Sequence, residues 1–531
     1  MHLKFLQLLL ADWIFYLLSI EVVEKMEINE QNLGQLRSIF LQTLVPNNVV
    51  RKEAEKYLGT IEIQPGFSIV LLHLISLLSK SVAPEDLAIR QSASVLFKNL
   101  VKRRWIIENE DATDRVTIPD GERETIKTHV VELMCTTPPQ VQMQLAEGVA
   151  IIAKCDFPDR WQSLLPQLVA KSKCNDIHEI VGVMSTANSI MKRFRNAQKS
   201  DELYSEIAYC LQHFAVPLLE SYKTNSERIA SVANDKVQLE SAFRAQRLMT
   251  RIYFSLNWQD IPEFFEDNIA LWMGEFRKFL EYENPILANN GEKDLPGSIE
   301  QLQSAIVENL NLYATKYEEE FAPFLEHFTK AVWQLLLEIG SQPKYDILAT
   351  SSIKFLTSVC SKKMNEPLFT DEVLREIVEH IVVKNLTATE ADEALFEDNP
   401  TDYICKDMEG TDQDTRRRSA CELVRGLLKF FNVKISQLCV TYIGAMLEQY
   451  RVTMVSTPHT LQHMPDKAVH FRMPYITFLF NMTVPLSVLP HIIYYHYYYY
   501  YYYYYYYYYY YYYYYYYYYY YYYYYYYHYY Y

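Results

Sequence analysis

The sequence has little of what enzymes, nucleic-acid binders and metalloproteins need. It contains only 13 glycines in 531 residues, and it lacks the GxxxxGK, GxSxG, HExxH and glycine-rich dinucleotide motifs. We therefore expect no enzyme, no bound cofactor and no metal site. Lys and Arg number 50 against 65 Asp and Glu, which gives a net charge of −15. Because nucleic-acid binding needs clustered positive charge, this balance argues against a nucleic-acid partner and favours basic protein partners.

Closely paired cysteines are also absent. The eight cysteines form no CxxC motif and have no histidine at metal-ligand spacing. The sequence therefore predicts reduced, mostly buried thiols, as in cytosolic and nuclear proteins. These cysteines are Cys135, Cys155, Cys174, Cys210, Cys360, Cys405, Cys421 and Cys439.

The N-terminal apolar segment is too short for a membrane span. The run from Phe5 to Ile20 is interrupted by Asp12, and a spanning helix needs roughly 20 apolar residues. No small-residue cleavage site follows it. Met26 begins a polar sequence typical of a native start, so we interpret residues 1–25 as a non-native upstream extension. The alternative is a secretory or membrane protein that starts with this segment, and protection of the chain from protease by microsomes would favour it.

The C-terminal end has an unusual composition. Residues 497–527 are an unbroken run of tyrosines, and five prolines are spaced between Arg451 and this run. No globular fold requires such a tract, and a trinucleotide repeat would encode it. The helical pattern also stops near Arg451. We interpret residues 451–531 as an aberrant tail that is unstructured and prone to aggregate.

Between Met26 and Tyr450 the apolar residues recur at helical spacing, and strand-like alternation is nearly absent. Residues 93–101, 324–339 and 420–431 each place their apolar residues on one stripe of a helix. Every stripe must pack against an apolar partner, because full burial of one Leu or Phe contributes about 1.5–3 kcal/mol. Breakers or N-caps mark the predicted helix starts; they lie at Pro46–Asn48, Ala83–Pro84, Thr137–Pro139 and Asp156–Pro158.

The spacing of these breakers fits helix pairs of the size of a HEAT repeat. At about 40 residues per pair, residues 26–450 would hold about ten pairs. The sequence thus predicts an all-α fold, a HEAT-repeat α-solenoid made of antiparallel helix pairs, with an inner face that offers a long surface to a protein partner. A general HEAT scaffold protein fits these observations as well as a transport receptor does.

Particular strings in residues 26–450 resemble the importin-β superfamily, and most closely its CAS-type exportins. In the N-terminal part they are Val50–Leu58, Leu96–Asn99 and Trp105. More specific strings follow at Asp156–Trp161, Phe254–Asn268 and Phe396–Arg418. The resemblance ends near Tyr450, and members of this family are about twice as long, so we expect the C-terminal arch that closes around cargo and Ran to be missing.

The resemblance implies a nuclear export receptor that binds importin-α together with GTP-loaded Ran and returns importin-α to the cytoplasm. It further implies shuttling between nucleus and cytoplasm, contact with nucleoporins and no insertion into membranes. An importin-type receptor for another cargo is the alternative within the superfamily. Requirement of Ran-GTP for importin-α binding would separate the two.

The resemblance also implies candidate Ran contacts in the N-terminal repeats, residues 26–110. These candidates are Arg51, Lys56, Lys98, Asn99, Arg103, Arg104 and Trp105. A structural interpretation stays open for each. Lys98 and Asn99 lie on the polar side of a helix, where solvated residues are the rule. The residues at positions 103–105 could instead interact with the helix dipole and pack the next turn.

An acidic insertion is predicted at residues 390–414, between HEAT repeats at 111–389 and 415–450. The resemblance implies that it contacts the GTPase, and the candidates are Glu397, Asp398, Asp412, Asp414, Arg416, Arg417 and Arg418. Pairing of a flexible acidic loop with a basic partner surface is one interpretation. In the other, the acids are solvated, Asp414 caps the next helix and the arginines lie on its outer face. Trp161 and Trp258 are expected in the core.

Overall fold

The computed structural model describes residues 25–105, 117–288, 295–387, 394–395, 397–399, 402 and 415–456. Most of the predicted upstream extension, of the acidic insertion and of the C-terminal tail lies outside these residues, as do Asp412 and Asp414. The described residues contain helices and no β-strand. The predicted all-α class is confirmed.

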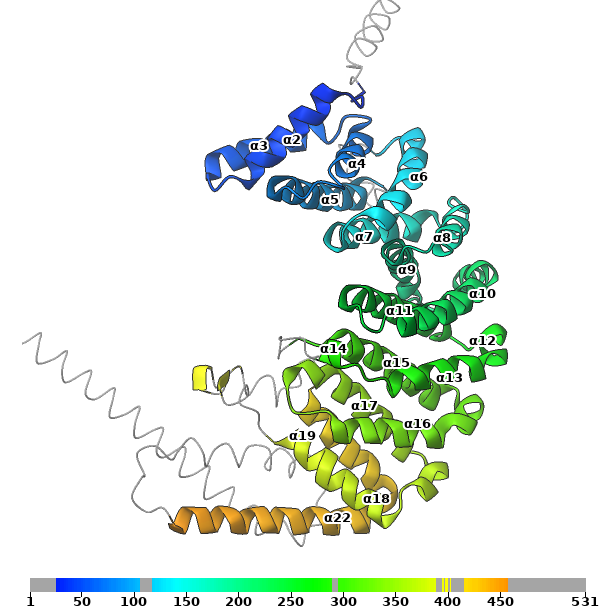
Figure 1. The fold of residues 1–531 in the computed structure, drawn as a ribbon, viewed down its shortest axis with the longest axis vertical. Coiled ribbons are helices and arrows are strands. Elements are labelled where there is room, and N and C mark those ends of the chain that lie inside the picture. Colours follow the sequence, from blue (N-terminus) through cyan, green and yellow to red (C-terminus); the bar gives the residue numbers. More distant parts are fainter. Residues whose placement is uncertain are drawn as a thin grey trace, which may run out of the picture. The chain divides into compact units, whose positions relative to one another are not determined.

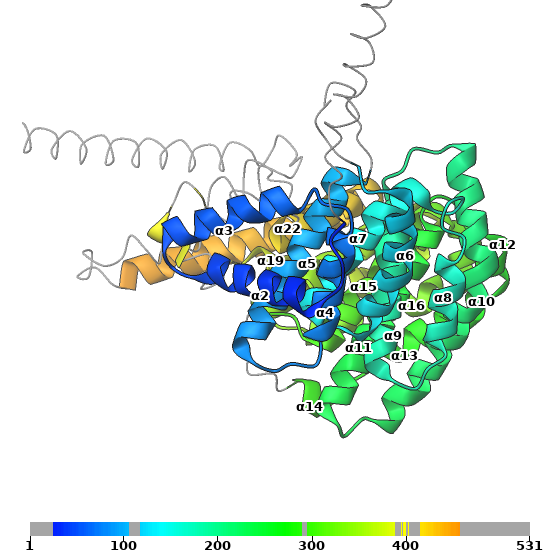
Figure 2. The same ribbon diagram turned by 90° about the horizontal axis from the view of Figure 1, so that it is seen from above.

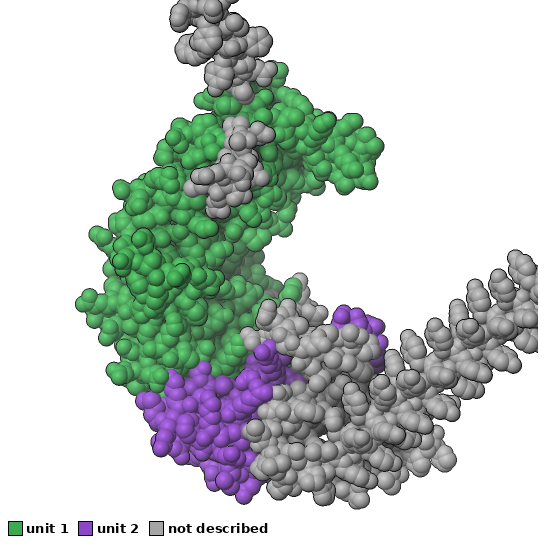
Figure 3. Space-filling model, turned by 180° about the vertical axis from the view of Figure 1, so that it is seen from behind, with its two compact units in different colours: residues 1–355 green, residues 356–531 purple. Residues whose placement is uncertain are grey.

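The chain divides into two compact units, Met1–Phe355 and Leu356–Tyr531 (Figure 3). The main helices of unit 1 are α2 (Glu30–Leu44), α3 (Asn48–Ile61), α4 (Phe67–Leu77), α5 (Pro84–Arg104), α6 (Asp120–Thr136), α7 (Pro139–Asp156), α8 (Leu164–Ser172), α9 (Ile177–Met191), α10 (Asp201–Ser231), α11 (Lys236–Asn257), α13 (Ile269–Leu280), α15 (Ser298–Lys316) and α16 (Glu318–Glu338). Shorter elements join them: η1 (Lys192–Arg195), α12 (Glu263–Asp267), α14 (Pro285–Ala288) and η2 (Pro343–Tyr345). Helix α17 (Asp346–Cys360) crosses the boundary between the units.

The helices of unit 1 pair in chain order and form two layers. Helix α2 packs on α3, α4 on α5, α6 on α7, α8 on α9 and α10 on α11. The second helices of the pairs, α5, α7, α9, α11 and α15, also pack each on the next, and they form one layer in Figure 1. Helices α6, α8, α10 and α13 form the other layer, and Figure 2 looks along the stack. Each pair thus contacts chiefly its neighbours, as in an α-solenoid.

The helix pairs differ in length, and on average they are longer than the roughly 40 residues assumed for one pair. Six pairs occupy residues 30–316, and the pair α10/α11 alone contains helices of 31 and 22 residues. The prediction of about ten pairs in residues 26–450 is therefore wrong. It assumed a uniform repeat of about 40 residues, whereas α10 continues through Pro217.

Most residues of the predicted apolar stripes are buried, and the others are half-buried. Ala93, Phe97 and Leu100 of α5 are inaccessible to solvent. Gly148 of α7 lies against the ring of Phe97, because a Cβ built at Gly148 would be 3.3 Å from the ring atom Cε1. The small residue therefore permits close approach of α5 and α7, and the contact between these helices is apolar.

Most of the predicted helix starts are confirmed. Asn47 caps α3, since its side chain accepts a hydrogen bond of 3.0 Å from the Val49 amide. Pro84 and Pro139 occupy the first positions of α5 and α7, where the missing N–H costs nothing. The prediction of a cap at Asp156 is wrong. Asp156 is the last residue of α7 and the next helix, α8, begins at Leu164.

A buried polar network fixes α11 against α15. The hydroxyl groups of Tyr253 and Tyr313 are 2.5 Å apart, and the Tyr313 hydroxyl donates to Oδ1 of Asn257 at 3.1 Å. Tyr317 donates to the main-chain oxygen of Asn257 at 2.6 Å. Burial raises the pKa of Tyr253 and Tyr313, so both stay protonated. Because every bond depends on the relative position of the two helices, the network sets their register.

Unit 2 is also helical. Its described elements are η3 (Lys363–Leu368), α18 (Asp371–Glu376), the π-helical η4 (Ile377–Val383), α19 (Lys384–Leu386) and α22 (Arg416–Ser456). Helix α22 contacts α18, η4 and α19, and it is kinked at Phe431, which has φ −117° and ψ 28°. The predicted end of helical structure near Arg451 is wrong, because α22 continues to Ser456.

Candidate partner-binding surface

Helix α3 presents two of the predicted contact residues to solvent. Arg51 and Lys56 are both exposed, and Lys56 lies on the side of α3 opposite to the buried Ala54 and Leu58. Arg51 donates to Oδ1 of Asn48 at 2.8 Å, and lies 3.8 Å from the Glu55 carboxylate, a contact of little energetic weight at an exposed site. Both side chains are accessible to a partner.

Lys98 and Asn99 lie on α5 above the buried Phe97. Each is partly exposed, and neither has a polar partner within the part of the chain that the structure describes. Helix α5 buries its opposite side against α4 and α7. The helix therefore holds an ammonium and an amide group at the surface with their hydrogen-bonding capacity unused.

Arg103 connects the first two helix pairs. Its guanidinium group lies 2.7 Å from Oε2 of Glu62, the residue that ends α3. The Arg103 side chain remains 46% exposed, while that of Glu62 is 18% exposed. Arg103 can therefore exchange this ion pair for one with a partner at low cost.

Arg104 and Trp105 are buried and have structural contacts. Arg104 donates to the main-chain oxygen atoms of Glu62 and Ile63, and burial lowers its pKa, although nearby carboxylates oppose this shift. Trp105 is 1% exposed, and the Arg123 guanidinium lies 5.3 Å from its ring centroid. Both side chains tie the end of α5 to its neighbours and are not available at the surface.

Glu122 of α6 holds the start of α4. Its carboxylate accepts a hydrogen bond of 2.9 Å from the amide of Gly66 and another from the hydroxyl of Ser68. Gly66 has φ +88°, in the left-handed region that favours glycine. No sequence pattern predicts this contact, because Glu122 is distant from Gly66 along the chain.

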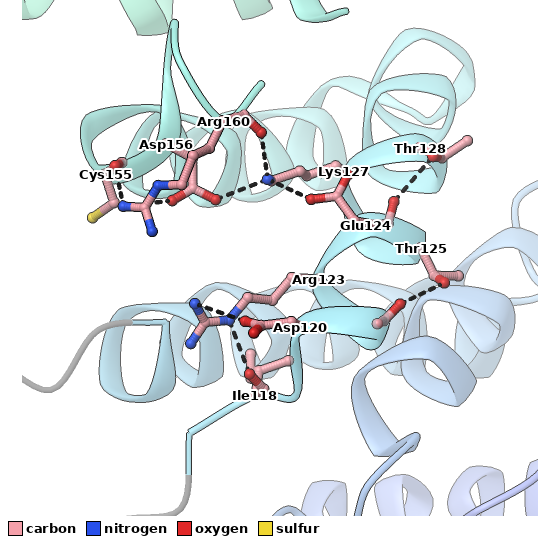
Figure 4. Close-up of polar contacts among 11 residues, drawn as sticks. Ile118, Asp120, Arg123, Glu124, Thr125, Lys127, Thr128, Cys155, Asp156 and Arg160 are labelled. Carbon is pink, nitrogen blue, oxygen red and sulfur yellow. Dashed lines mark hydrogen bonds and ion pairs between the residues drawn. The ribbon is translucent and has the colours of Figure 1, made fainter. Parts of the chain in front are cut away.

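A second polar cluster joins α6 to the end of α7 (Figure 4). Nζ of Lys127 lies 2.9 Å from Oδ2 of Asp156, and these side chains are 4% and 3% exposed. Lys127 also contacts Glu124 at 2.8 Å and donates to the main-chain oxygen of Arg160 at 2.8 Å. Arg160 lies 3.4 Å from the same Asp156 carboxylate. The Asp156–Trp161 string therefore has a structural role here, fixing the connection between α7 and α8.

Trp161 and Trp258 differ in their exposure to solvent. Trp161 is 3% exposed, so its prediction as a core residue is confirmed. Trp258 is partly exposed at the end of α11, where Nζ of Lys316 lies 4.6 Å from its ring centroid. The prediction of a core position for Trp258 is wrong, because α11 turns this residue toward solvent.

The described part of the acidic insertion is exposed. Glu397 and Asp398 face solvent. Thr415 caps α22, since its hydroxyl accepts from the Arg418 amide at 3.2 Å. Of the three predicted arginines, Arg417 is 6% exposed, Arg416 is half-buried and Arg418 is exposed. The placement of all three on an outer face is wrong for Arg417.

The cysteines of the described residues are free thiols. Cys135, Cys210, Cys360, Cys421 and Cys439 are buried, and two others are half-buried. The prediction of mostly buried thiols is confirmed for these residues. No group of His, Cys, Asp or Glu with metal-site geometry occurs among the described residues. In the same part of the chain, no helix combines the length and apolar character that a membrane span needs.

Comparisons with known proteins identify the family. Residues 190–458 match the Cse1 family, and residues 54–136 match the importin-beta N-terminal domain. The chain is 42% identical over 426 residues to exportin-2 of Oreochromis niloticus and 41% identical over 426 residues to exportin-2 of Homo sapiens. Each of these alignments covers 80% of this chain and 43% of the relative.

Solved structures agree with this assignment. The structure of the exportin Cse1 in its cargo-free, cytoplasmic state is similar, with a TM-score of 0.76 and 34% identity over 85% of this chain and 46% of that chain. A structure of importin beta has a TM-score of 0.52 and 16% identity over 86% of this chain and 47% of that chain, which supports the fold alone.

The stacked helix pairs and these structural relatives define a HEAT-repeat α-solenoid of the importin-β class. The predicted fold is confirmed. The Cse1 match covers just over half of the chain, and the chain belongs to the Cse1 family. The resemblance to CAS-type exportins is therefore confirmed. The chain spans less than half the length of the curated relatives it matches.

Proposed function

We propose that this protein acts as a nuclear export receptor that binds importin-α together with GTP-bound Ran and shuttles between nucleus and cytoplasm, contacting nucleoporins on its way. Membership of the Cse1 family and the similarity to exportin-2 proteins support this function. The protein's role is binding. Any GTP would be hydrolysed by the partner GTPase.

The observation that carries the Ran proposal is the pair Lys98 and Asn99. They lie within the match to the importin-beta N-terminal domain, are partly exposed and have no polar partner in the described structure. An ammonium and an amide without internal partners can bind a protein surface without breaking existing bonds, which keeps the cost of association low.

Arg51, Lys56 and Arg103 complete the proposed Ran surface, because each is exposed and at most weakly paired. Arg104 and Trp105 are buried at the end of α5 and hold this helix in place. We place a second contact at the acidic insertion and the start of α22, through Glu397, Asp398, Asp412, Asp414, Arg416 and Arg418, which would pair with oppositely charged partner groups.

A binding assay tests the proposal. The full chain is immobilised and offered Ran loaded with GDP or with a non-hydrolysable GTP analogue, with and without importin-α. We expect retention of the GTP form only, and importin-α retention that requires it. The Lys98→Ala/Asn99→Ala variant should weaken Ran binding by about tenfold or more, as loss of a central contact does. Lys173→Ala, at an exposed lysine between α8 and α9, is the matched control.

The outcomes separate the alternatives. Equal retention of both nucleotide forms, or of neither, would contradict Ran recognition and favour a HEAT scaffold protein. Importin-α binding without Ran-GTP would favour an importin-type receptor. Unchanged binding by the double variant would remove Lys98 and Asn99 from the contact surface.

A further inference from the structure

The solvent face of α11 carries a row of arginines. Arg244, Arg247 and Arg251 follow at intervals of three and four residues, so they lie on one side of the helix. Phe254 and Trp258 continue the same side. We call these five residues the α11 stripe. Helices α9, α10 and α15 pack on the other sides of α11 (Figure 1), and every stripe residue is exposed or half-buried.

Arg195 of η1 adds a fourth guanidinium group to the stripe. Its guanidinium lies 4.8 Å from the ring centroid of Phe254. It donates to Oγ of Ser255 and to the main-chain oxygen of Arg251, both at 2.9 Å. These acceptors are neutral, so they orient Arg195 without neutralising its charge.

Within the part of the chain that the structure describes, none of the four arginines forms an ion pair with a carboxylate. Arg247 donates to the neutral Oε1 of Gln301 at 2.7 Å, and neither Arg244 nor Arg251 forms a side-chain hydrogen bond or ion pair within the described residues. Glu308 is close enough to influence Arg195 and Arg247 but forms no ion pair with them. Elsewhere in unit 1 arginines are commonly paired: Arg37 with Asp86, Arg103 with Glu62, Arg123 with Asp120, Arg160 with Asp156, Arg193 with Glu206 and Arg277 with Glu281.

The crowding of these charges is unfavourable in the free protein. Burial and, to a smaller extent, the neighbouring Arg251 lower the pKa of Arg195 to about 10, although Glu308 opposes this shift. Burial and Arg251 also lower the pKa of Arg247. The Nε atom of Arg247 is buried without a hydrogen-bond acceptor. An anionic group bound to the exposed guanidinium groups would reduce this repulsion.

We propose that the α11 stripe, together with Arg195, is a docking site for an acidic protein segment that carries an aromatic or aliphatic residue beside its carboxylates. Carboxylates match the forked donors of guanidinium groups. The partly exposed rings of Phe254 and Trp258 provide contacts for the apolar residue.

The spacing of the arginines restricts the segment. Arg244 and Arg251 are separated by about 10 Å along the helix, from a rise of about 1.5 Å per residue. An extended chain covers that distance in about three residues. The bound segment therefore has acidic residues about three positions apart.

A protein segment suits this site better than a nucleic acid does. Nucleic-acid affinity comes from neutralising many phosphates along a strand, whereas the stripe offers four cations in a chain of net charge −15. The site also lies on helices other than α3 and α5, so it does not depend on the proposed Ran surface.

The test measures fluorescence anisotropy of a fluorescein-labelled peptide that has glutamate at every third position and a phenylalanine beside each glutamate, titrated with the full chain. The same peptide with glutamine in place of glutamate and a single-stranded oligothymidine of equal charge are the comparators. The charge-reversal variant Arg244→Glu/Arg251→Glu is compared with Lys80→Glu/Lys173→Glu, which makes the same charge change at exposed lysines. Thermal unfolding and circular dichroism verify that both variants are folded.

We expect the acidic peptide to bind, the glutamine peptide to bind at least about tenfold more weakly, and Arg244→Glu/Arg251→Glu to lose about tenfold or more in affinity while the lysine control does not. No binding of the acidic peptide, equal binding by the two variants, or tighter binding of the oligothymidine would overturn the proposal. Peptide binding without Ran binding would contradict only the proposed function.

Discussion

Lys127 and Asp156 form an ion pair that is almost completely removed from water, with side chains 4% and 3% exposed. The ion pair matters for stability because removal of one residue leaves the charge of the other buried. A single buried charge without its partner costs about 3–5 kcal/mol, whereas replacement of both partners by apolar residues is often nearly neutral.

We therefore expect Asp156→Leu to lower the free energy of unfolding by up to about 3–5 kcal/mol, because Lys127 would remain buried with only the exposed Glu124 carboxylate as its counter-charge. The double variant Lys127→Met/Asp156→Leu should recover much of this loss. Urea unfolding followed by circular dichroism measures both. Removal of the exposed pair of Lys192 and Glu147 is the control and should cost less than about 1 kcal/mol. A double variant less stable than the single variant would contradict the argument.

The buried thiols predict a pH dependence. Burial raises the pKa of Cys135, Cys210, Cys360 and Cys439 from 9.0 to about 12, so these groups stay protonated in the folded chain where an unfolded chain ionises. The stability they contribute is complete below pH 9.0 and is lost as the pH rises toward about 12. Iodoacetamide at pH 8 should label Cys155 and Cys174 before these four, because the thiolate is the reactive form. Mass spectrometry of the labelled protein checks this, with urea-unfolded chain as the control.

For single residues, the sequence predicted which side chains are exposed better than it predicted which side chains form ion pairs. Helical spacing was enough to place Lys98 and Asn99 at the surface and Phe97 in the core. It could not predict that Asp156 meets Lys127, since a helical pattern does not specify which charged residues of different helices meet. The three-and-four spacing of Arg244, Arg247 and Arg251 is visible in the sequence, but their lack of carboxylate partners is a property of packing.

At the scale of single helices, the start of α4 depends on Gly66. Its φ of +88° costs about 1–2 kcal/mol for any residue with a Cβ, and a Cβ here would collide with the main-chain oxygen of Met26. We expect Gly66→Ala to lower the free energy of unfolding by at least about 1–2 kcal/mol.

Gly59 provides the matched control for this variant. It lies in α3, and a Cβ there would meet nothing within 4 Å. Gly59→Ala should be neutral or stabilise the chain by about 0.5–1 kcal/mol. Thermal unfolding of both variants decides the matter, and equal destabilisation would show that backbone conformation at Gly66 is not the cause.

Helix starts marked by proline or asparagine were predictable, as at Asn47 and Pro84, because these residues act through local geometry. The end of α22 was not. The sequence pattern weakens near Arg451 as prolines begin further along, yet hydrogen bonding continues to Ser456. The kink at Phe431 also has no signal of its own, since no proline or glycine lies at that position.

At the scale of the whole molecule, stability is distributed through contacts between neighbouring pairs. Among the described residues, α2 packs mainly on α3, α4 and α5, and α3 packs mainly on α2, whereas α9 packs on α6, α7, α8 and α11. We expect backbone amides of α2 and α3 to exchange with deuterium faster than those of α9, because local opening there breaks fewer contacts. Hydrogen-exchange mass spectrometry measures this, and equal protection of both regions would contradict it.

The fold class and the family were predictable because helical periodicity and specific strings extend through most of residues 26–450. The number of pairs was not predictable, since the pair α10/α11 is longer than an average repeat. The proposed Ran surface is formed by residues of α3 and α5. Within it, burial separates Arg104 and Trp105 from the accessible residues, which sequence spacing alone could not do.

The hydroxyl network of Tyr253, Tyr313 and Tyr317 has a mechanical consequence. Sliding α15 along α11 would break several buried hydrogen bonds at once, whereas the apolar contact of Phe97 with Gly148 has no directional bonds to break. Elastic deformation of unit 1 would therefore be uneven: the α11/α15 joint moves as a stiff block, and the compliance needed to accommodate a bound protein resides nearer the N-terminal pairs.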